Sequence, residues 1–161
     1  MVDRDQFREA MAHLPAAVNI LSSDGAAGLA GLTATAVSSV TDEPGTLLVC
    51  ISRARRAHGL FLKNGVFCVN TLAADQQAIA DVFASEPDMP TRFSHGIWRT
   101  LVTGSPVLEG AAIAFDCRIT AVSEVGTHSV IFGHVQAVSL ATISTGLLYY
   151  GRSYHPVALG A

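Results

Sequence analysis

The strongest constraint on the fold is a pair of long strand patterns in the C-terminal half of the chain. Residues 111–124 and 128–140 are both rich in apolar and β-branched side chains, and only Val125-Gly126-Thr127 separates them. A connection this short joins antiparallel neighbours, because parallel strands need a crossover of a dozen or more residues. We therefore expect the chain to be built on antiparallel hairpins.

The rest of the chain fits the same plan. A second hairpin is predicted at 16–32, where Asp24-Gly25 supplies the turn between two short strands. Further strands are expected at 46–51, 66–72, 98–102 and 147–150, and helices at 3–13, 54–64 and 73–84. Residues 85–94 contain two prolines and are expected to form a loop, as a lid or an interface segment. These patterns predict a mainly β fold: an antiparallel β-barrel with peripheral helices, in one domain spanning 1–161.

Composition bears on assembly. Of 161 residues, 50% are hydrophobic and 14% are charged, against a usual charged share of about 25%. A surface so poor in charge favours an oligomer with a substantial interface, and an alanine-rich composition is the other explanation.

Several classes of function and location are disfavoured. The net charge is −3, and no basic stripe is long enough to follow a nucleic-acid backbone. No apolar run approaches the roughly 18 residues of a membrane span, and the charged N-terminal segment lacks the apolar region of a secretory signal. The three cysteines are far apart, so we expect reduced structural thiols in a cytoplasmic protein and no metal site.

A run rich in hydroxyl groups is the first candidate for a binding site. Thr33, Thr35, Ser38, Ser39 and Thr41 are separated by Ala34, Ala36, Val37 and Val40. Small side chains would let a planar ligand approach the backbone, and the hydroxyls could bind its polar rim or a phosphate. A strand edge followed by a turn explains the same composition.

Two further groups of residues complete the candidates. The arginines of 53–56 follow a predicted buried strand, where they could hold a phosphate or form a solvated turn. His128 begins a long strand and His155 follows Tyr154; each histidine could serve a ligand or be structural.

Common catalytic motifs are absent from the sequence. Gly25, Gly28 and Gly31 spell G-x-x-G-x-x-G, whereas the dinucleotide fingerprint is G-x-G-x-x-G between a strand and a helix. The sequence also offers no nucleophile elbow, P-loop or paired carboxylates. From the residues alone, the prediction ends at a β-rich domain with one ligand cradle.

The chain nevertheless resembles a known family. The segments that carry the resemblance are AVNI at 17–20, GLTATAVSSVTDEPGTLLVCIS at 31–52, FCVNTL at 67–72, GTH at 126–128 and YYGRSYHP at 149–156. Together they are similar to the flavin reductase family with the FMN-binding split-barrel fold of antiparallel Greek-key type. Within it, the chain most resembles small reductase components such as those of 4-hydroxyphenylacetate 3-monooxygenase and of pyrimidine degradation.

This resemblance implies a function and a set of roles. FMN, or FAD, would be reduced by hydride transfer from NADH or NADPH and released to a partner monooxygenase, and the protein would be a homodimer. Thr33, Ala34, Thr35 and Ala36 would line the flavin ring. Ser38, Ser39 and one residue of 53–56, for which we take Arg56, would hold the ribityl phosphate. Ser52 would also bind the cofactor. His128, Tyr154 and His155 would lie on the nicotinamide side.

Two other functions remain open. The reduced flavin could pass electrons to a bound acceptor such as a corrinoid, or the protein could be a flavin- or haem-binding module without turnover. The sequence does not select between FMN and FAD, between NADH and NADPH, or among partner oxygenases.

Overall fold

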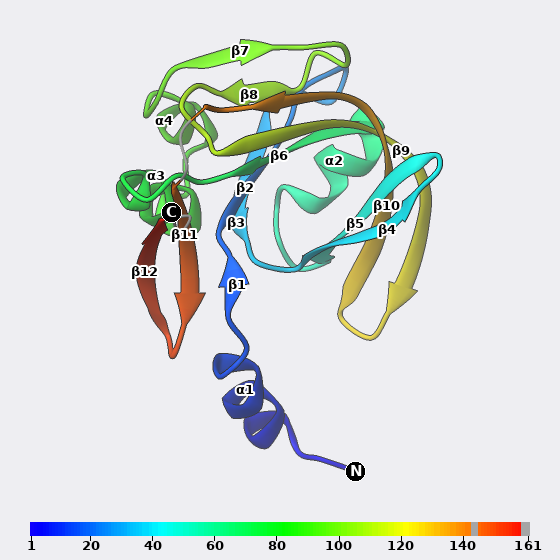
Figure 1. Ribbon diagram of the computed structural model, residues 1–161. Helices are drawn as coiled ribbons and strands as arrows, with labels where there is room; N and C mark the ends of the chain where they lie inside the picture. Colours follow the sequence, from blue (N-terminus) through cyan, green and yellow to red (C-terminus); the bar gives the residue numbers. More distant parts are fainter. Residues whose placement is uncertain (143–144, 159–161) are drawn as a thin grey trace.

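The computed structural model describes residues 1–142 and 145–158 (Figure 1). Most of it is antiparallel β-structure with a few short helices, which confirms the mainly β and antiparallel part of the predicted fold class. The helices are α1 (Arg4–Ala12), α2 (His58–Asn64), α3 (Gln77–Ser85) and α4 (Met89–Phe93). The strands are β1 (Ala16–Ala17), β2 (Asn19–Ser23), β3 (Ala30–Ala34), β4 (Val37–Asp42), β5 (Gly45–Ser52), β6 (Val66–Thr71), β7 (Trp98–Thr100), β8 (Pro106–Leu108), β9 (Ile113–Val125), β10 (His128–Leu140), β11 (Thr145–Tyr150) and β12 (Ser153–Ala158).

The main sheet has seven strands in the order β3-β2-β6-β9-β10-β5-β4. Its two edge strands, β3 and β4, are neighbours in the sequence, joined only by Thr35 and Ala36. A connection of two residues forces the sheet to curl until its edges approach one another. Within the described ranges no ladder joins β3 to β4, so the curled sheet is open at this point.

The β9–β10 hairpin is the longest element of the sheet. His128 pairs with Val125, and the register continues to the pair Leu140–Ile113 with two irregularities. Gly126 turns the chain with φ of 55°, a conformation that glycine adopts without the steric cost of a side chain. The hairpin predicted from sequence is therefore confirmed, and so is the β2–β3 hairpin.

The helices and a small C-terminal sheet surround the main sheet. β1 belongs to the three-stranded sheet β1-β11-β12, and Figure 1 shows β11 and β12 on the other side of β1 from the β9–β10 hairpin tip. Helix α1 projects from the body and has no buried residue. Asp3 caps its N-terminus, because the Asp3 carboxylate accepts hydrogen bonds from the Asp5 and Gln6 amides.

Several local predictions were wrong, and one of them is the start of the helix expected at 54–64, which begins at His58. The helix expected at 73–84 begins later, at Gln77, because residues 73–76 form a turn closed by the Gln76 side chain on the Ala73 amide. The loop expected at 85–94 contains α4, which Asp88 caps. Residues 153–158 form β12, a strand that the sequence analysis did not predict. It pairs with β11, and a tight turn at Gly151-Arg152 connects the two strands.

The core is divided between the inside of the curled sheet and the space beneath α3. The first cluster contains Phe61, Phe67 and Ile131, and the second contains Phe83, Leu72 and Leu147. Gly31 lets β3 approach the second cluster, since a Cβ there would lie 2.7 Å from the Phe83 ring. The β3 end that leads into Thr35 is thereby fixed against α3.

Candidate active site

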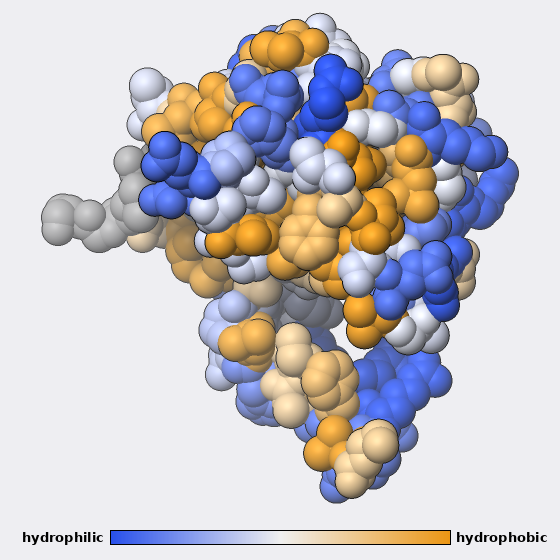
Figure 2. All heavy atoms as spheres, turned by 90° about the vertical axis from the view of Figure 1, so that its right-hand side faces the viewer, coloured by the Kyte–Doolittle hydropathy of each residue, from blue (hydrophilic) through white to orange (hydrophobic). Residues whose placement is uncertain are grey.

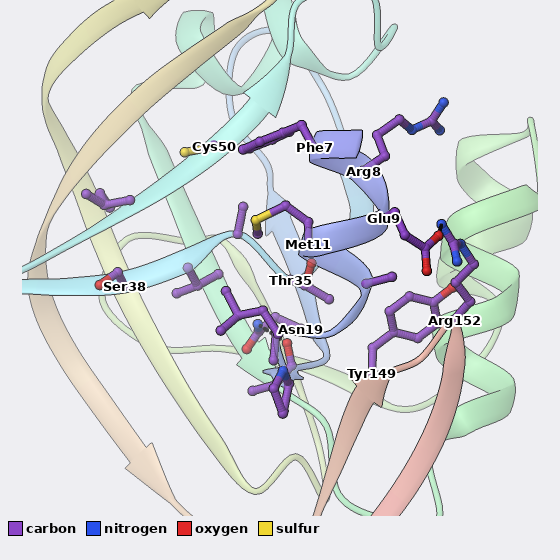
Figure 3. Close-up of a pocket in the computed structure, with 18 of the residues that line it drawn as sticks. Phe7, Arg8, Glu9, Met11, Asn19, Thr35, Ser38, Cys50, Tyr149 and Arg152 are labelled. Carbon is purple, nitrogen blue, oxygen red and sulfur yellow. Dashed lines mark hydrogen bonds and ion pairs between the residues drawn. The ribbon is translucent and has the colours of Figure 1, made fainter. Parts of the chain in front are cut away.

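A large groove lies between α1 and the main sheet, with a volume of about 1330 Å³. The link between β3 and β4 forms part of its wall, and the N-terminal helix forms another part. The close-up shows Phe7 and Met11 of α1 directed toward Cys50 of β5 and the β3–β4 link that carries Thr35 (Figure 3). Among its lining residues are Thr35, Ala36, Val37, Ser38, Leu48, Cys50, Asn19, Tyr149 and Arg152.

Thr35 and Ala36 place polar atoms at this groove. They lie outside both flanking strands, and both are exposed. Among the described residues, no acceptor contacts their backbone N–H groups and no partner contacts the Thr35 hydroxyl. The Ala36 carbonyl oxygen, in contrast, accepts from the Cys50 amide at 3.0 Å, which fixes the link against β5. A rigid link of small residues with free donors fits the polar edge of a planar heterocycle.

Thr33 and Ala34 serve the fold more directly than the groove. The Thr33 hydroxyl donates to the Ala80 carbonyl oxygen of α3 at 2.7 Å. Ala34 is half-buried and pairs with Asn19, whose side-chain amide donates to the Ala34 carbonyl oxygen. Neither lines the groove, so these two residues support the link to Thr35 from behind.

Ser38 and Ser39 point to different sides of β4, because successive side chains alternate along a strand. Ser38 lines the groove together with Leu48, its partner on β5. Ser39 pairs with the buried Leu47 and does not line the groove. Of the two serines, the structure therefore places only Ser38 beside Thr35.

Ser52 and His128 form a pair across β5 and β10. Ser52 is half-buried, and its hydroxyl accepts from the Ala54 amide at 3.4 Å. His128 is exposed, and its Nδ1 lies 2.9 Å from the Thr127 hydroxyl. The neighbouring Ser129 is buried, and its hydroxyl lies 2.9 Å from Nε2 of His58, a contact that the sequence did not indicate. These residues lie near the turn between β9 and β10, and none of them lines the large groove.

The arginines of 53–56 divide into two groups. Arg53 lies 2.5 Å from the Glu124 carboxylate and also donates to the Gly126 carbonyl oxygen, so it braces the β9–β10 turn. Arg55 and Arg56 are exposed and line a second groove of about 740 Å³. Leu32 of β3 lies in the wall of that groove, just before the Thr33–Ala36 segment.

Tyr154 and His155 belong to the small sheet. The Tyr154 ring contacts the Tyr149 ring edge-on at 5.3 Å, and burial, followed by the nearby Asp81 charge, raises the Tyr154 pKa. His155 is exposed, with Nε2 3.0 Å from both the Ser153 hydroxyl and the Tyr150 carbonyl oxygen. Figure 1 shows β12 and the His128 end of β10 on opposite sides of the molecule. One chain therefore does not bring His128 together with Tyr154 and His155.

The sequence analysis missed the contribution of α1. Phe7 and Met11 are 57% and 46% exposed, although both line the groove. The helix is held by Glu9, whose carboxylate lies 2.7 Å from the Arg152 guanidinium of the β11–β12 turn; that guanidinium lowers the Glu9 pKa. An amphipathic pattern at the start of the chain was visible, but nothing in it indicated what its apolar side would face.

The cysteines differ in accessibility. Cys68 and Cys117 are buried, and burial raises the pKa of both thiols, to about 12 for Cys117. Cys50 is half-buried, lines the large groove, and also has a raised pKa because of burial. All three are free thiols, and their raised pKa values favour the protonated, weakly nucleophilic form.

Membrane insertion through a helix finds no support in the described chain, where none of the helices has the length and apolar character to span a bilayer.

Comparison with known proteins gives consistent matches over nearly the whole chain. The family model described as "Flavin reductase like domain" matches residues 11–158. The chain is 51% identical over 154 residues to a protein of Stutzerimonas stutzeri named FMN reductase (NADH) RutF, covering 96% of this chain and 88% of that one.

Solved structures agree. A putative flavin reductase from Haemophilus somnus has a TM-score of 0.94 at 46% identity, covering 97% of this chain and all of the other. BorF, the flavin reductase component of a bacterial two-component tryptophan halogenase, has a TM-score of 0.89 at 28% identity, covering 97% and 99%.

Proposed function

Because the chain belongs to the flavin reductase-like family, we propose that it is an NADH-dependent FMN reductase that transfers hydride to the flavin and releases the reduced flavin to a partner monooxygenase. The observation that carries this proposal is the Thr35-Ala36 link. It presents small side chains and free donors to a groove large enough for a flavin. The relative named FMN reductase (NADH) supports this choice of flavin and nicotinamide.

The fit to a flavin rests on the chemistry of the donors. FMN has a flat ring with a polar edge and a phosphate at the far end. The Thr35 and Ala36 amides and the Thr35 hydroxyl would bind the polar edge, and Ser38 would contact the ring from β4. Arg55 and Arg56 line the second groove, where a phosphate would be neutralised. The Ser52 hydroxyl contacts the amide of Ala54, a residue that lines the same groove. When bound, the flavin would supply the hydride acceptor, and the chain's own residues would bind and orient it.

Positioning is the main contribution of the protein. Hydride transfer needs two reacting atoms held close and aligned, and it needs no dedicated acid or base in the transfer itself. The cradle is fixed from behind by the Thr33–Ala80 hydrogen bond and the Cys50–Ala36 hydrogen bond. His128, Tyr154 and His155 are therefore proposed to orient the nicotinamide.

A homodimer would bring these three residues to one site. His128 lies apart from Tyr154 and His155 within a chain, so a shared role requires the hairpin of one subunit to approach the small sheet of another (Figure 1). Figure 2 shows apolar residues over the face that carries β4 and the β9–β10 hairpin. Val40, Val122 and Val125 of these strands are 47%, 43% and 61% exposed. This apolar surface supports the proposed dimer.

Three finer expectations belong to the same proposal. We expect the curled seven-stranded sheet to form the split barrel of Greek-key type, with its edge strands β3 and β4 next to each other where the barrel is open. The tryptophan halogenase component BorF supports a two-component role, with reduced flavin passed to an oxygenase. Three free thiols suit the cytoplasm.

Steady-state oxidation of NADH and NADPH with FMN, FAD and riboflavin tests the function. We expect NADH oxidation that depends on added FMN. Purified protein that is yellow but does not oxidise either nucleotide would favour a binding module and overturn the reductase. Transfer to a corrinoid in preference to release of free flavin would favour the bound-acceptor alternative.

A further inference from the structure

The large groove has more room than a flavin ring fills. Its volume is about 1330 Å³, whereas pockets that bind one small ligand span about 300–1,000 Å³. The Thr35-Ala36 link borders one part of the groove, and α1 with the β11–β12 turn borders another. Hydride transfer requires the nicotinamide ring to lie against the flavin ring. The remainder of the dinucleotide must therefore extend away from Thr35, and the α1 end of the groove offers the space for it.

Four charged residues line the α1 end of the groove: Asp5, Arg8, Glu9 and Arg152. Nη2 of Arg152 donates to Oε2 of Glu9 at 2.7 Å, and the two side chains are 57% and 58% exposed, so a ligand can reach them. Figure 3 shows this pair near Tyr149, whose ring also lines the groove. Among the described residues, Arg8 has no carboxylate within salt-bridge distance. The charges at this end therefore balance only while Glu9 is present.

The backbone holds Arg152 in an unusual conformation. Its φ is 62°, and within residues 1–142 and 145–158 it is the only residue other than glycine with a positive φ. Such positions in two-residue hairpin turns favour glycine or asparagine. The preceding Gly151 amide donates to the Ala12 carbonyl oxygen at 2.8 Å, which holds the turn against the end of α1. An arginine in this place indicates a role for the side chain, which the turn presents to Glu9.

A carboxylate beside the adenosine ribose distinguishes NADH from NADPH. The 2′-hydroxyl of NADH can donate to the carboxylate, whereas the 2′-phosphate of NADPH is repelled by it. Oε1 of Glu9 lies 3.8 Å from Nδ1 of His13 and accepts no hydrogen bond from the described residues, so it is free to accept from the hydroxyl. Oε2 engages Arg152, a guanidinium that would otherwise attract the 2′-phosphate. The ion pair therefore disfavours NADPH in two ways.

We infer that Glu9, held by Arg152, makes the protein select NADH over NADPH by binding the adenosine ribose at the α1 end of the large groove. The inference rests on the proposed function, because it assumes that the flavin ring lies at Thr35 and that a nicotinamide nucleotide reduces it. Glu9 determines specificity and takes no part in hydride transfer. Arg8 is placed to meet the pyrophosphate, which both nucleotides share.

The test compares kcat/KM for NADH and NADPH with FMN saturating. Glu9→Gln should raise kcat/KM for NADPH about tenfold and lower it for NADH about threefold, effects of the size of one charged contact. Because α1 has no buried residue, the fold should be retained. The double variant Glu9→Gln/Arg152→Gln should lose the gain with NADPH, since it lacks the freed guanidinium. The gain should also disappear in about 1 M salt, where the screening length falls to about 3 Å.

Glu124→Gln is the matched control. Glu124 is also an exposed carboxylate that pairs with an arginine, Arg53, and it does not line the large groove. Its loss should leave the ratio of NADPH to NADH efficiency unchanged. A similar rise in this control would overturn the inference, because net charge alone would then explain the effect. Equal losses with both nucleotides in Glu9→Gln would also overturn it, since Glu9 would then only hold α1 in place.

The two proposals can fail separately. Isothermal titration calorimetry with NAD⁺ and NADP⁺ measures binding without turnover. Wild-type protein that prefers NAD⁺, loses this preference in Glu9→Gln, and yet does not oxidise NADH would retain the nucleotide site and refute the reductase. Rapid NADH oxidation with the same nucleotide preference in the wild type and in Glu9→Gln would keep the reductase and refute the role of Glu9. A wild type that uses both nucleotides equally would refute that role as well.

Discussion

Thr33 and Ala80 are joined by a hydrogen bond in which the Thr33 hydroxyl donates to the Ala80 carbonyl oxygen at 2.7 Å. This bond ties the end of β3 to α3, so the hydroxyl of Thr33 is already engaged two residues before the exposed Thr35. Threonines that look equivalent in the sequence therefore have different tasks. Thr33 holds the cradle in place, and Thr35 faces the groove.

Thr33→Val should act on stability more than on binding. The substitution keeps the shape and removes one half-buried hydrogen bond, so the free energy of unfolding should fall by about 1 kcal/mol. FMN affinity should stay within about twofold, or ~0.4 kcal/mol. Urea denaturation and flavin fluorescence measure the two quantities. A large loss of affinity with unchanged stability would show that the Thr33 hydroxyl contacts the ligand.

Thr35→Arg should fill the cradle and remove FMN binding without unfolding the protein. Thr35 is exposed, so a larger side chain meets no core residue, and we expect affinity to fall by at least about a hundredfold. Thr120→Arg, on an exposed position of β9, is the matched control. Unchanged FMN affinity in Thr35→Arg would place the flavin elsewhere.

His128→Ala should separate the nicotinamide from the flavin. If His128 orients the nicotinamide, the KM for NADH should rise about tenfold while the FMN dissociation constant changes less. His134→Ala, in the same strand and half-buried, serves as the control. The opposite pattern, with FMN binding weakened more than the KM for NADH is raised, would contradict the role given to His128.

Alkylation of the cysteines should report occupation of the large groove. In the native protein only Cys50 is partly accessible, so a thiol reagent should modify Cys50 slowly and spare Cys68 and Cys117. Bound FMN should slow modification of Cys50 further, because Cys50 lines the groove. Peptide mass spectrometry identifies the modified residue. Modification of Cys50 at the same rate with and without saturating FMN would mean that the flavin does not cover it.

Stability should fall in alkaline solution. Burial raises the Cys117 pKa from 9.0 to about 12, so the folded thiol stays protonated where the unfolded thiol ionises. The unfolded state then binds fewer protons, and the free energy of unfolding decreases as the pH rises from about 9 toward 12. Cys117→Ala should show a shallower decrease over this range in urea denaturation. Equal slopes in the two proteins would show that Cys117 does not contribute.

The sequence by itself determined the local elements and the family. Hairpins at β9–β10 and β2–β3 followed from short turns between apolar strands, because turn length restricts how two strands can pair. The Asp3 cap and the end of α2 at Gly65 were also set locally, since a capping carboxylate and a residue with positive φ act within one turn. The TATAV run predicted the cradle because its pattern of small and hydroxyl residues is contiguous in the chain, and three of its residues, Thr35, Ala36 and Val37, line the large groove.

The tertiary structure decided what each of these residues faces. Whether Arg53, Arg55 or Arg56 is available to a phosphate depended on Glu124, which is 71 residues from Arg53 and takes that arginine for the β9–β10 turn. Likewise, Arg92 lines the second groove only because α4 lies across that groove from Arg55 and Arg56. Ion pairing and burial depend on which distant segments meet in space, and local sequence patterns do not determine those contacts.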